Sequence, residues 1–154
     1  PKCLMPILDR PLLDLWIENC VEAGIDEIYI NTSYKREIVE YYLSHHPRKD
    51  SIRIVVEERL LGTAGTIAEI SQNFQGESAL VVHADNLSLF SVKDFILAHS
   101  QRPVSCPITM MTFASPTPET CGIAKLNEEK VVTELTVVQK DIQAIIPLSM
   151  VSNL

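Results

Sequence analysis

Short apolar runs rich in β-branched residues alternate with amphipathic segments over the first hundred residues, and this alternation constrains the fold more than any other feature. The runs have the length of strands, and the segments around them carry apolar residues at helical spacing. Strands are expected at 27–31, 52–57 and 78–85, and helices at 11–23, 35–46, 64–74 and 91–100. The alternation predicts βαβ units, and hence a three-layer α/β fold with a mostly parallel sheet and helices on both faces.

The last third of the chain changes character. The segments 107–114, 122–127 and 131–138 have the pattern of strands separated by hairpin-length gaps. We therefore expect a mixed edge on the otherwise parallel sheet. A length of 154 residues fits a single domain, and no internal repeat divides it.

Composition excludes several classes of partner. The chain is 46% hydrophobic, and its net charge of −7 comes without a basic run, so no nucleic acid is expected as a ligand. No apolar stretch reaches the ~20 residues that span a bilayer, and no signal peptide opens the sequence, so no membrane association is expected. Four cysteines form no CxxC pair and are predicted to be buried free thiols in a reducing cytoplasm. They are Cys3, Cys20, Cys106 and Cys121.

Polar residues and glycines gather where the predicted strands end. Ligands of open parallel sheets bind at the carboxyl ends of the strands, and this rule selects 31–33, 57–65 and 85–86. Gly62 and Gly65 let the backbone approach a ligand at the start of a helix, and Asp85 offers a hard oxygen ligand suited to Mg²⁺. Taken alone, each feature has a structural explanation as well: a tight strand-to-helix turn for the glycines, and a cap or turn residue for Asp85.

Three stretches in this order carry a resemblance to a known family. They are "PKCLMPILDRPLLDLWIENCVEAGIDEIYINTSY", "VVEERLLGTAG" and "LVVHADNL". Together they resemble the NDP-sugar pyrophosphorylase family of nucleotidyltransferases over residues 1 to about 135, and the "LGTAG" loop is similar to that of the mannose-1-phosphate guanylyltransferase branch. The resemblance implies a nucleotidyltransferase-like, Rossmann-like fold. It also implies an enzyme that joins a sugar 1-phosphate to a nucleoside triphosphate and releases pyrophosphate.

The resemblance assigns the phosphate and metal side of the site to two residues. Lys2 matches the lysine of the family's "PK…P" motif, which faces the triphosphate, and Asp85 matches its metal-binding aspartate. In this reading Asp85 holds Mg²⁺ and Lys2 offsets phosphate charge, and both are catalytic. Such a reaction needs two anions positioned in line, with charge spread by a metal and cations, and no covalent nucleophile.

Nucleotide and sugar contacts follow from the same resemblance. Glu57 falls where the family reads the base edge, Gly62 falls where its backbone contacts the base, and Thr63 lies in the same nucleotide-binding loop. A carboxylate at 57 is compatible with the N–H donors of guanine, so GTP is the preferred nucleotide. Gly122 matches a glycine near the sugar. Cys121 stands where the family has tyrosine, so the resemblance does not determine which side chain forms that wall of the pocket.

Parts of the family pattern are missing from the sequence. The family opens with a strand and a glycine-rich GxGxRLxPLT loop, whereas this chain starts at "PKCLMPI". An "EKP" segment is expected after 131–135, yet "VVTEL" runs into "TVVQ", and "KDIQAIIPLSM" resembles a later family helix. We therefore interpret 1–154 as one nucleotidyltransferase-like domain that lacks its first strand, the glycine-rich loop and a segment near 135–140. A chain break is expected near Leu135 and Thr136.

Two other function classes stay open. A non-catalytic relative would bind a nucleotide or sugar nucleotide and act as a regulatory subunit. A phosphate-receiving domain would need an acidic pair after its first strand and a lysine after its last, and neither is visible. His83 forms an H-x-D pair with Asp85 but is expected to be a buried, hydrogen-bonded histidine, and Trp16 is expected in the core. The sequence leaves open whether the protein is a monomer or a homo-oligomer.

Overall fold

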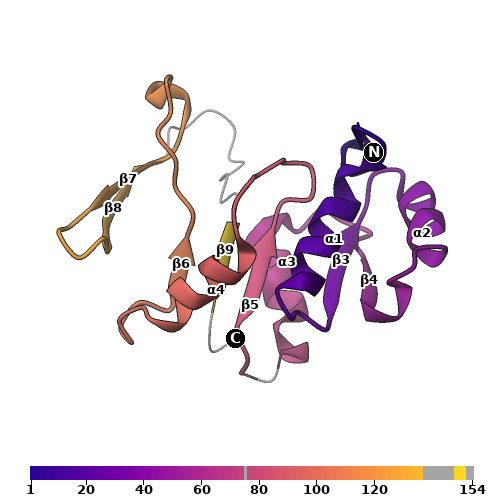
Figure 1. The fold of residues 1–154 in the computed structure, drawn as a ribbon, viewed down its shortest axis with the longest axis horizontal. Helices are drawn as coiled ribbons and strands as arrows, with labels where there is room; N and C mark the ends of the chain where they lie inside the picture. The colour runs from indigo at the N-terminus through magenta and orange to yellow at the C-terminus, as the bar shows by residue number, and fades with distance from the viewer. Residues whose placement is uncertain (75, 137–147, 152–154) are drawn as a thin grey trace.

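A computed structural model of the protein describes residues 1–74, 76–136 and 148–151. Its body consists of alternating helices and strands (Figure 1). In chain order these are α1 (Leu12–Glu22), β3 (Ile28–Thr32), α2 (Arg36–Ser44), β4 (Ile52–Val56), α3 (Gly62–Ile70), β5 (Ala79–Val82), α4 (Val92–Ser100), β6 (Ile108–Met110) and β9 (Leu148–Val151). Two hairpins flank the body, β1 (Pro6–Ile7) with β2 (Arg10–Pro11), and β7 (Ile123–Leu126) with β8 (Val132–Thr136). Short 3-10 turns complete the fold at Lys2–Leu4, Lys49–Ser51, Ser71–Asn73 and Pro118–Thr120.

The strands of the body form two hydrogen-bonded groups. β3 and β4 pair in parallel, as expected for a βαβ unit. β5, β9 and β6 form the second group, in which β9 lies in the middle and runs antiparallel to both neighbours. The α/β class is therefore confirmed. Among the described strand pairs, however, the expected parallel pairing holds only for β3 and β4, and the antiparallel strand lies inside the second group rather than at an edge.

Two local expectations are corrected. α3 begins at Gly62 instead of residue 64 and ends at Ile70, after which a 3-10 turn continues. Residues 148–151 form β9, whereas 148–150 were expected in a helix, because this segment finds strand partners on both sides. β8 runs through Leu135 and Thr136, but most of the segment near 135–140 lies outside the described residues, so the chain break expected there stays a prediction. The rest of the expected helix, 140–147, lies outside the described residues.

Helix α1 packs against both groups of strands. Figure 1 shows it between β3 and β4 on one side and β5, β9 and β6 on the other. Leu13 and Ile17 belong to a buried cluster with α2 and β4, and partly buried side chains of β3 pack against it. Leu12 and Trp16, one position earlier in each case, belong to a second cluster that is packed against β5 and α4. Because both core clusters include α1, this helix joins the two strand groups.

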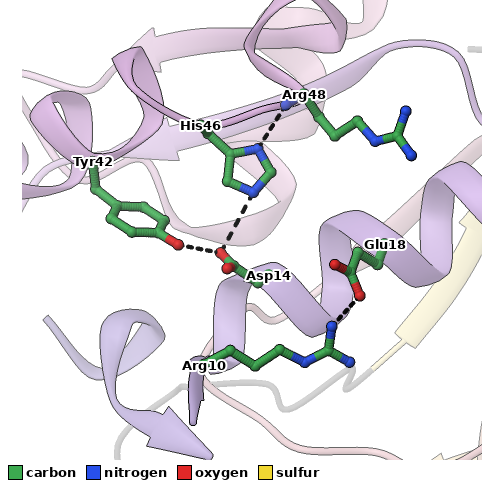
Figure 2. Close-up of polar contacts among 6 residues, drawn as sticks. All are labelled: Arg10, Asp14, Glu18, Tyr42, His46 and Arg48. Carbon is green, nitrogen blue, oxygen red and sulfur yellow. Dashed lines mark hydrogen bonds and ion pairs between the residues drawn. The ribbon is translucent and has the colours of Figure 1, made fainter.

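A polar cluster reinforces the contact between α1 and the end of α2 (Figure 2). The Tyr42 hydroxyl donates to Asp14 Oδ1 at 2.6 Å, and His46 Nε2 lies 3.6 Å from the same oxygen. The backbone N–H of Arg48 donates to His46 Nδ1 at 3.0 Å, so that nitrogen carries no proton and Nε2 faces Asp14 as the N–H. Burial, followed by the hydrogen bond to Asp14, raises the pKa of Tyr42.

Two further expectations can be compared with the structure. All four cysteines are free, but only Cys20 is buried as predicted, because the other three are partly exposed. Burial raises the pKa of the Cys20 thiol to about 11, which makes it an inert core residue. In the part of the chain that the structure describes, no helix has the length and apolar character needed to cross a membrane.

We expect Ile17→Ala to lower the free energy of unfolding by about 2–4 kcal/mol, because Ile17 is 1% exposed and the change leaves a cavity between α1 and its neighbours. Leu97→Ala, on α4 and 53% exposed, serves as the control and should cost about 1 kcal/mol or less. Urea denaturation of both variants measures the difference. Equal losses would contradict the central place of α1.

Alkaline pH should weaken the α1–α2 contact through Tyr42. Its folded pKa is raised above the ordinary value of 10.0, so its contribution is fully present below pH 10 and is lost as the pH rises toward the folded pKa. Cys20 adds a loss between pH 9 and about 11. Tyr42→Phe should therefore flatten the fall of unfolding free energy above pH 10, whereas Tyr41→Phe, at a 70% exposed position, should not. Denaturation at pH 8 to 11.5 checks this.

Candidate functional site

Asp85 lies in a turn directly after β5. The backbone N–H of Asn86 donates to the carbonyl of His83 at 3.1 Å, which closes a four-residue turn with Ala84 and Asp85 at its centre. Ala84 packs toward the core, whereas Asp85 is exposed. The structure therefore presents this carboxylate to solvent at the carboxyl end of a strand, as the sequence predicted.

The segment that carries Lys2 lies beside this turn. Cys3 and Leu4 pack against the same core cluster as Ala84. The pKa of the Cys3 thiol is raised, mainly by burial, and the negative charge of Asp85 adds to the rise. Lys2, the neighbour of Cys3, is exposed. The structure thus brings the predicted phosphate-facing lysine and the predicted metal-binding aspartate into one region, and Figure 1 shows the N-terminus and the loop after β5 on the same side of the molecule.

Glu57 follows β4 and is buried, with 5% of its surface exposed. Its backbone N–H donates to the Thr32 carbonyl at the end of β3, at 2.9 Å. Its side-chain Oε1 accepts hydrogen bonds from the Thr66 hydroxyl and from the Asn31 amide, the latter at 3.5 Å. Two neutral donors from α3 and β3 therefore hold this buried carboxylate in place.

The "LGTAG" glycines have local structural reasons. Gly62 has φ +70°, a left-handed conformation that other residues adopt with strain. A Cβ at Gly65 would lie 2.8 Å from Leu61 Cβ, which is too close for any larger residue. Thr63, partly buried, and its neighbours form the first turn of α3, where backbone N–H groups lack helical partners. The two glycines are therefore needed for the shape of this turn. An anion could bind to the free backbone N–H groups at the start of α3.

Gly122 lies apart from the other candidates. It precedes β7, and the β7–β8 hairpin extends away from α1, β3 and β4 (Figure 1). Gly122 is exposed, and a Cβ there would meet only the Thr136 carbonyl, at 3.8 Å. Its neighbour Cys121 contacts the Ser115 hydroxyl at 3.3 Å. The structure therefore does not join the predicted sugar side to the nucleotide side.

The donor set around Asp85 fits one kind of metal. Among the described residues, no three His, Cys, Asp or Glu side chains are close enough to hold an ion by themselves. His83 was expected to be buried and hydrogen-bonded, but the residue is partly exposed, and its buried ring Nε2 has no hydrogen-bond partner in that part of the chain. A zinc site needs three or four protein ligands. Mg²⁺ keeps waters and is commonly bound through one or two carboxylates plus substrate phosphates, which a single exposed Asp85 fits.

Sequence reasoning missed two residues of this site. Thr66 lies inside an ordinary helical pattern, and Trp16 reads as a core residue, so no motif marks either. Asn31 was among the strand-end residues, and the parallel pairing of β3 and β4 brings it to Glu57. A depression of about 230 Å³ lies elsewhere, between the carboxyl end of α1 and the start of α4, and contains none of the candidates.

The chain belongs to the nucleotidyl transferase family, because the model of that family matches residues 1–136. It is 30% identical over 101 residues to a D-glycero-α-D-manno-heptose 1-phosphate guanylyltransferase of Aneurinibacillus thermoaerophilus, covering 64% of this chain and 43% of that protein. It is 27% identical over 130 residues to a mannose-1-phosphate guanylyltransferase of Mycobacterium tuberculosis, covering 84% and 36%. The chain thus spans less than half the length of these two relatives.

Solved structures confirm the fold. HddC from Yersinia pseudotuberculosis matches with a TM-score of 0.77 at 17% identity, over 99% of this chain and 67% of that one. A putative glucose-1-phosphate thymidylyltransferase from Bacillus anthracis, crystallised with sucrose, matches with a TM-score of 0.80 at 15% identity, over 98% and 62%. At these identities the likeness concerns the fold, which is of the Rossmann-like nucleotidyltransferase type.

Thr66→Val should destabilise the protein by about 1–3 kcal/mol, because a buried carboxylate loses a hydrogen-bond donor without a change in side-chain shape. Thr66→Ser keeps the hydroxyl and should recover most of that loss. Ser71→Ala, which removes a hydroxyl bonded only within its own helical turn, is the matched control at the other end of α3. Thermal denaturation compares the three. A Val variant as stable as the Ser variant would contradict the Thr66–Glu57 bond.

Proposed function

We propose that the full-length protein is a sugar-1-phosphate nucleotidyltransferase of the mannose-1-phosphate guanylyltransferase type. In this reaction a phosphate oxygen of the sugar 1-phosphate attacks the α-phosphorus of a nucleoside triphosphate. A new P–O bond forms, the bond to the β-phosphate breaks, and pyrophosphate leaves with the bonding electrons. The substrates are a nucleoside triphosphate, with GTP preferred, and a sugar 1-phosphate.

The placement of Asp85 beside the Lys2 segment carries the proposal. Both are exposed, and they come from segments 83 residues apart that pack on one cluster. A carboxylate and an ammonium group in one region suit a reaction between two phosphate-bearing substrates. Family membership supports the same chemistry, since the relatives described above are named for guanylyl transfer to heptose and mannose 1-phosphates.

Each residue has a role in this scheme. Asp85 would hold Mg²⁺, which supplies charge stabilisation at the reacting phosphates. Lys2 orients the triphosphate and offsets its charge. Gly62 and Thr63 contribute backbone groups of the first turn of α3 to the nucleotide, and Gly122 contacts the sugar.

The base preference rests on Glu57. A carboxylate accepts hydrogen bonds and does not donate when ionised, which suits the N1–H and N2–H₂ donors of guanine. Two neutral donors hold Glu57, so it keeps its acceptor character at a fixed position. A structure of HddC complexed with GMP-PN shows a guanine nucleotide on a protein of the same fold.

A cytoplasmic location completes the proposal. Four free cysteines and nucleotide substrates fit a reducing compartment. Assembly into a homo-oligomer is left to measurement, for which sedimentation of the full-length protein is the direct test.

Asp85→Asn in the full-length protein should leave the fold intact, because the side chains are nearly isosteric, and should lower turnover about 10²–10³-fold by loss of charge at the reacting centre. Nucleotide affinity without metal should stay equal or rise, because a carboxylate near phosphates is gone. Pyrophosphate release with GTP and a panel of sugar 1-phosphates gives the rate, and a melting curve gives stability.

Asp94→Asn is the matched control, at an exposed aspartate in the first turn of α4. It should leave turnover unchanged. Full activity of Asp85→Asn at limiting Mg²⁺ would place the metal elsewhere. Tight GTP binding by the wild type without any pyrophosphate release would instead favour the regulatory, non-catalytic relative.

A further inference from the structure

The turn that carries Asp85 is held from the core by Trp16. The indole N–H of Trp16, on α1, donates to the carbonyl oxygen of Asn86 at 2.9 Å, across 70 residues of sequence. Asn86 closes the turn through its own N–H bond to the His83 carbonyl. The indole therefore holds the peptide unit between Asn86 and Leu87, one residue beyond Asp85.

The Trp16 ring is itself fixed by its surroundings. It is 4% exposed and belongs to the cluster that packs against Leu80 and Val82 of β5. Its centroid lies 6.1 Å from that of Phe90, where the loop after the turn reaches α4. Trp16 thus belongs to the cluster against which the strand before the turn packs, lies beside the ring of Phe90 at the end of the loop, and donates a hydrogen bond to the last residue of the turn.

Asp85 has little else to fix it. Within the described residues its carboxylate makes no hydrogen bond or ion pair, and the side chain is exposed. Its position therefore depends on the backbone of the turn, and the backbone depends on the two hydrogen bonds at Asn86. A carboxylate that must meet a metal and two substrates at once gains from such a rigid support.

We propose that Trp16 is a positioning residue: its indole N–H fixes the turn His83–Asn86 so that the Asp85 carboxylate stands where Mg²⁺ and the substrate phosphates meet. This inference rests on the function proposed for Asp85. In this inference Trp16 acts through a hydrogen bond as well as through the packing of its ring, whereas its burial alone would indicate packing only. The group that matters is the N–H donor, which phenylalanine lacks while it fills most of the same space.

Trp16→Phe in the full-length protein separates the two roles. The measured quantity is the ratio of GTP affinities with and without Mg²⁺, obtained by calorimetry, together with the Mg²⁺ concentration for half-maximal pyrophosphate release. We expect Trp16→Phe to lower the affinity ratio and to raise the half-maximal Mg²⁺ concentration, each about fivefold to tenfold, a factor commonly carried by one hydrogen bond. Turnover at saturating Mg²⁺ should change much less.

Phe95→Leu is the matched control, because Phe95 packs in the same cluster and stacks edge-on against Phe90 but makes no bond to the turn. It should lower the melting temperature and leave the Mg²⁺ dependence unchanged. A Trp16→Phe variant that behaves like Phe95→Leu would overturn the positioning role alone. A wild type whose GTP affinity does not respond to Mg²⁺ would overturn the metal role of Asp85, and the positioning role with it.

Tryptophan fluorescence keeps the proposal testable if Trp16→Phe does not fold. The sequence holds one tryptophan, and any outside these 154 residues would first be replaced by phenylalanine. Mg²⁺ with GTP should change the emission of Trp16 in the wild type, and Asp85→Asn should abolish the part of that change that depends on Mg²⁺. An emission that ignores Mg²⁺–GTP while calorimetry shows binding would contradict the link between Trp16 and the turn.

Discussion

The packing of α1 between two groups of strands is the contact on which the rest of the structure depends. Within the described residues, β3 and β4 share no ladder with β5, β9 and β6, so backbone hydrogen bonds do not join the groups. Leu13 and Ile17 face one core cluster, and Leu12 and Trp16 face the other. Neighbouring helical positions point about 100° apart, so one short helix buries two apolar faces at once. The hydrogen bond from Tyr42 to Asp14 adds direction to this contact, whereas the exposed ion pair between Arg10 of β2 and Glu18 of α1 (Figure 2) contributes little.

The candidate site depends on the same helix. Glu57 follows a strand of one group and Asp85 follows a strand of the other, and α1 contributes to both core clusters, while Ala84 beside Asp85 packs against the first of them. Each carboxylate is also oriented by a donor from a different element: Thr66 of α3 bonds to Glu57 directly, and Trp16 of α1 bonds to the turn of Asp85. Functional side chains on loops thereby gain support from the more rigid helices.

Local patterns predicted most elements within about two residues, because helical and strand periodicities are properties of each segment alone. They failed where partners are distant. Residues 148–151 become a strand through pairing with β5 and β6, and nothing in "LSMV" specifies that pairing. Trp16 and Asn86 are 70 residues apart, so the sequence spacing does not indicate the hydrogen bond between them.

The ends of the predicted strands did indicate site residues, since parallel pairing of β3 with β4 brings Asn31 near Glu57. α3, which carries Thr66, begins two residues earlier than the sequence pattern indicated.

The two carboxylates differ in the way that their proposed tasks require. Mg²⁺ gives up its waters reluctantly and accepts only one or two protein oxygens beside substrate phosphates, so its aspartate must be exposed, as Asp85 is. Discrimination between bases gains from the opposite environment. Leaving a buried hydrogen-bond acceptor without a donor costs far more free energy than leaving an acceptor exposed to water. A base that presents the wrong edge to the buried Glu57 would therefore be rejected more strongly. The bonds from Thr66 and Asn31 offset part of the cost of burying that charge before any ligand binds. One fold thus holds one carboxylate dry for selection and another wet for metal, because Glu57 is buried and bonded to Thr66 of α3 and Asn31 of β3, whereas Asp85 lies in an exposed turn; base selection and metal binding remain the roles proposed for them.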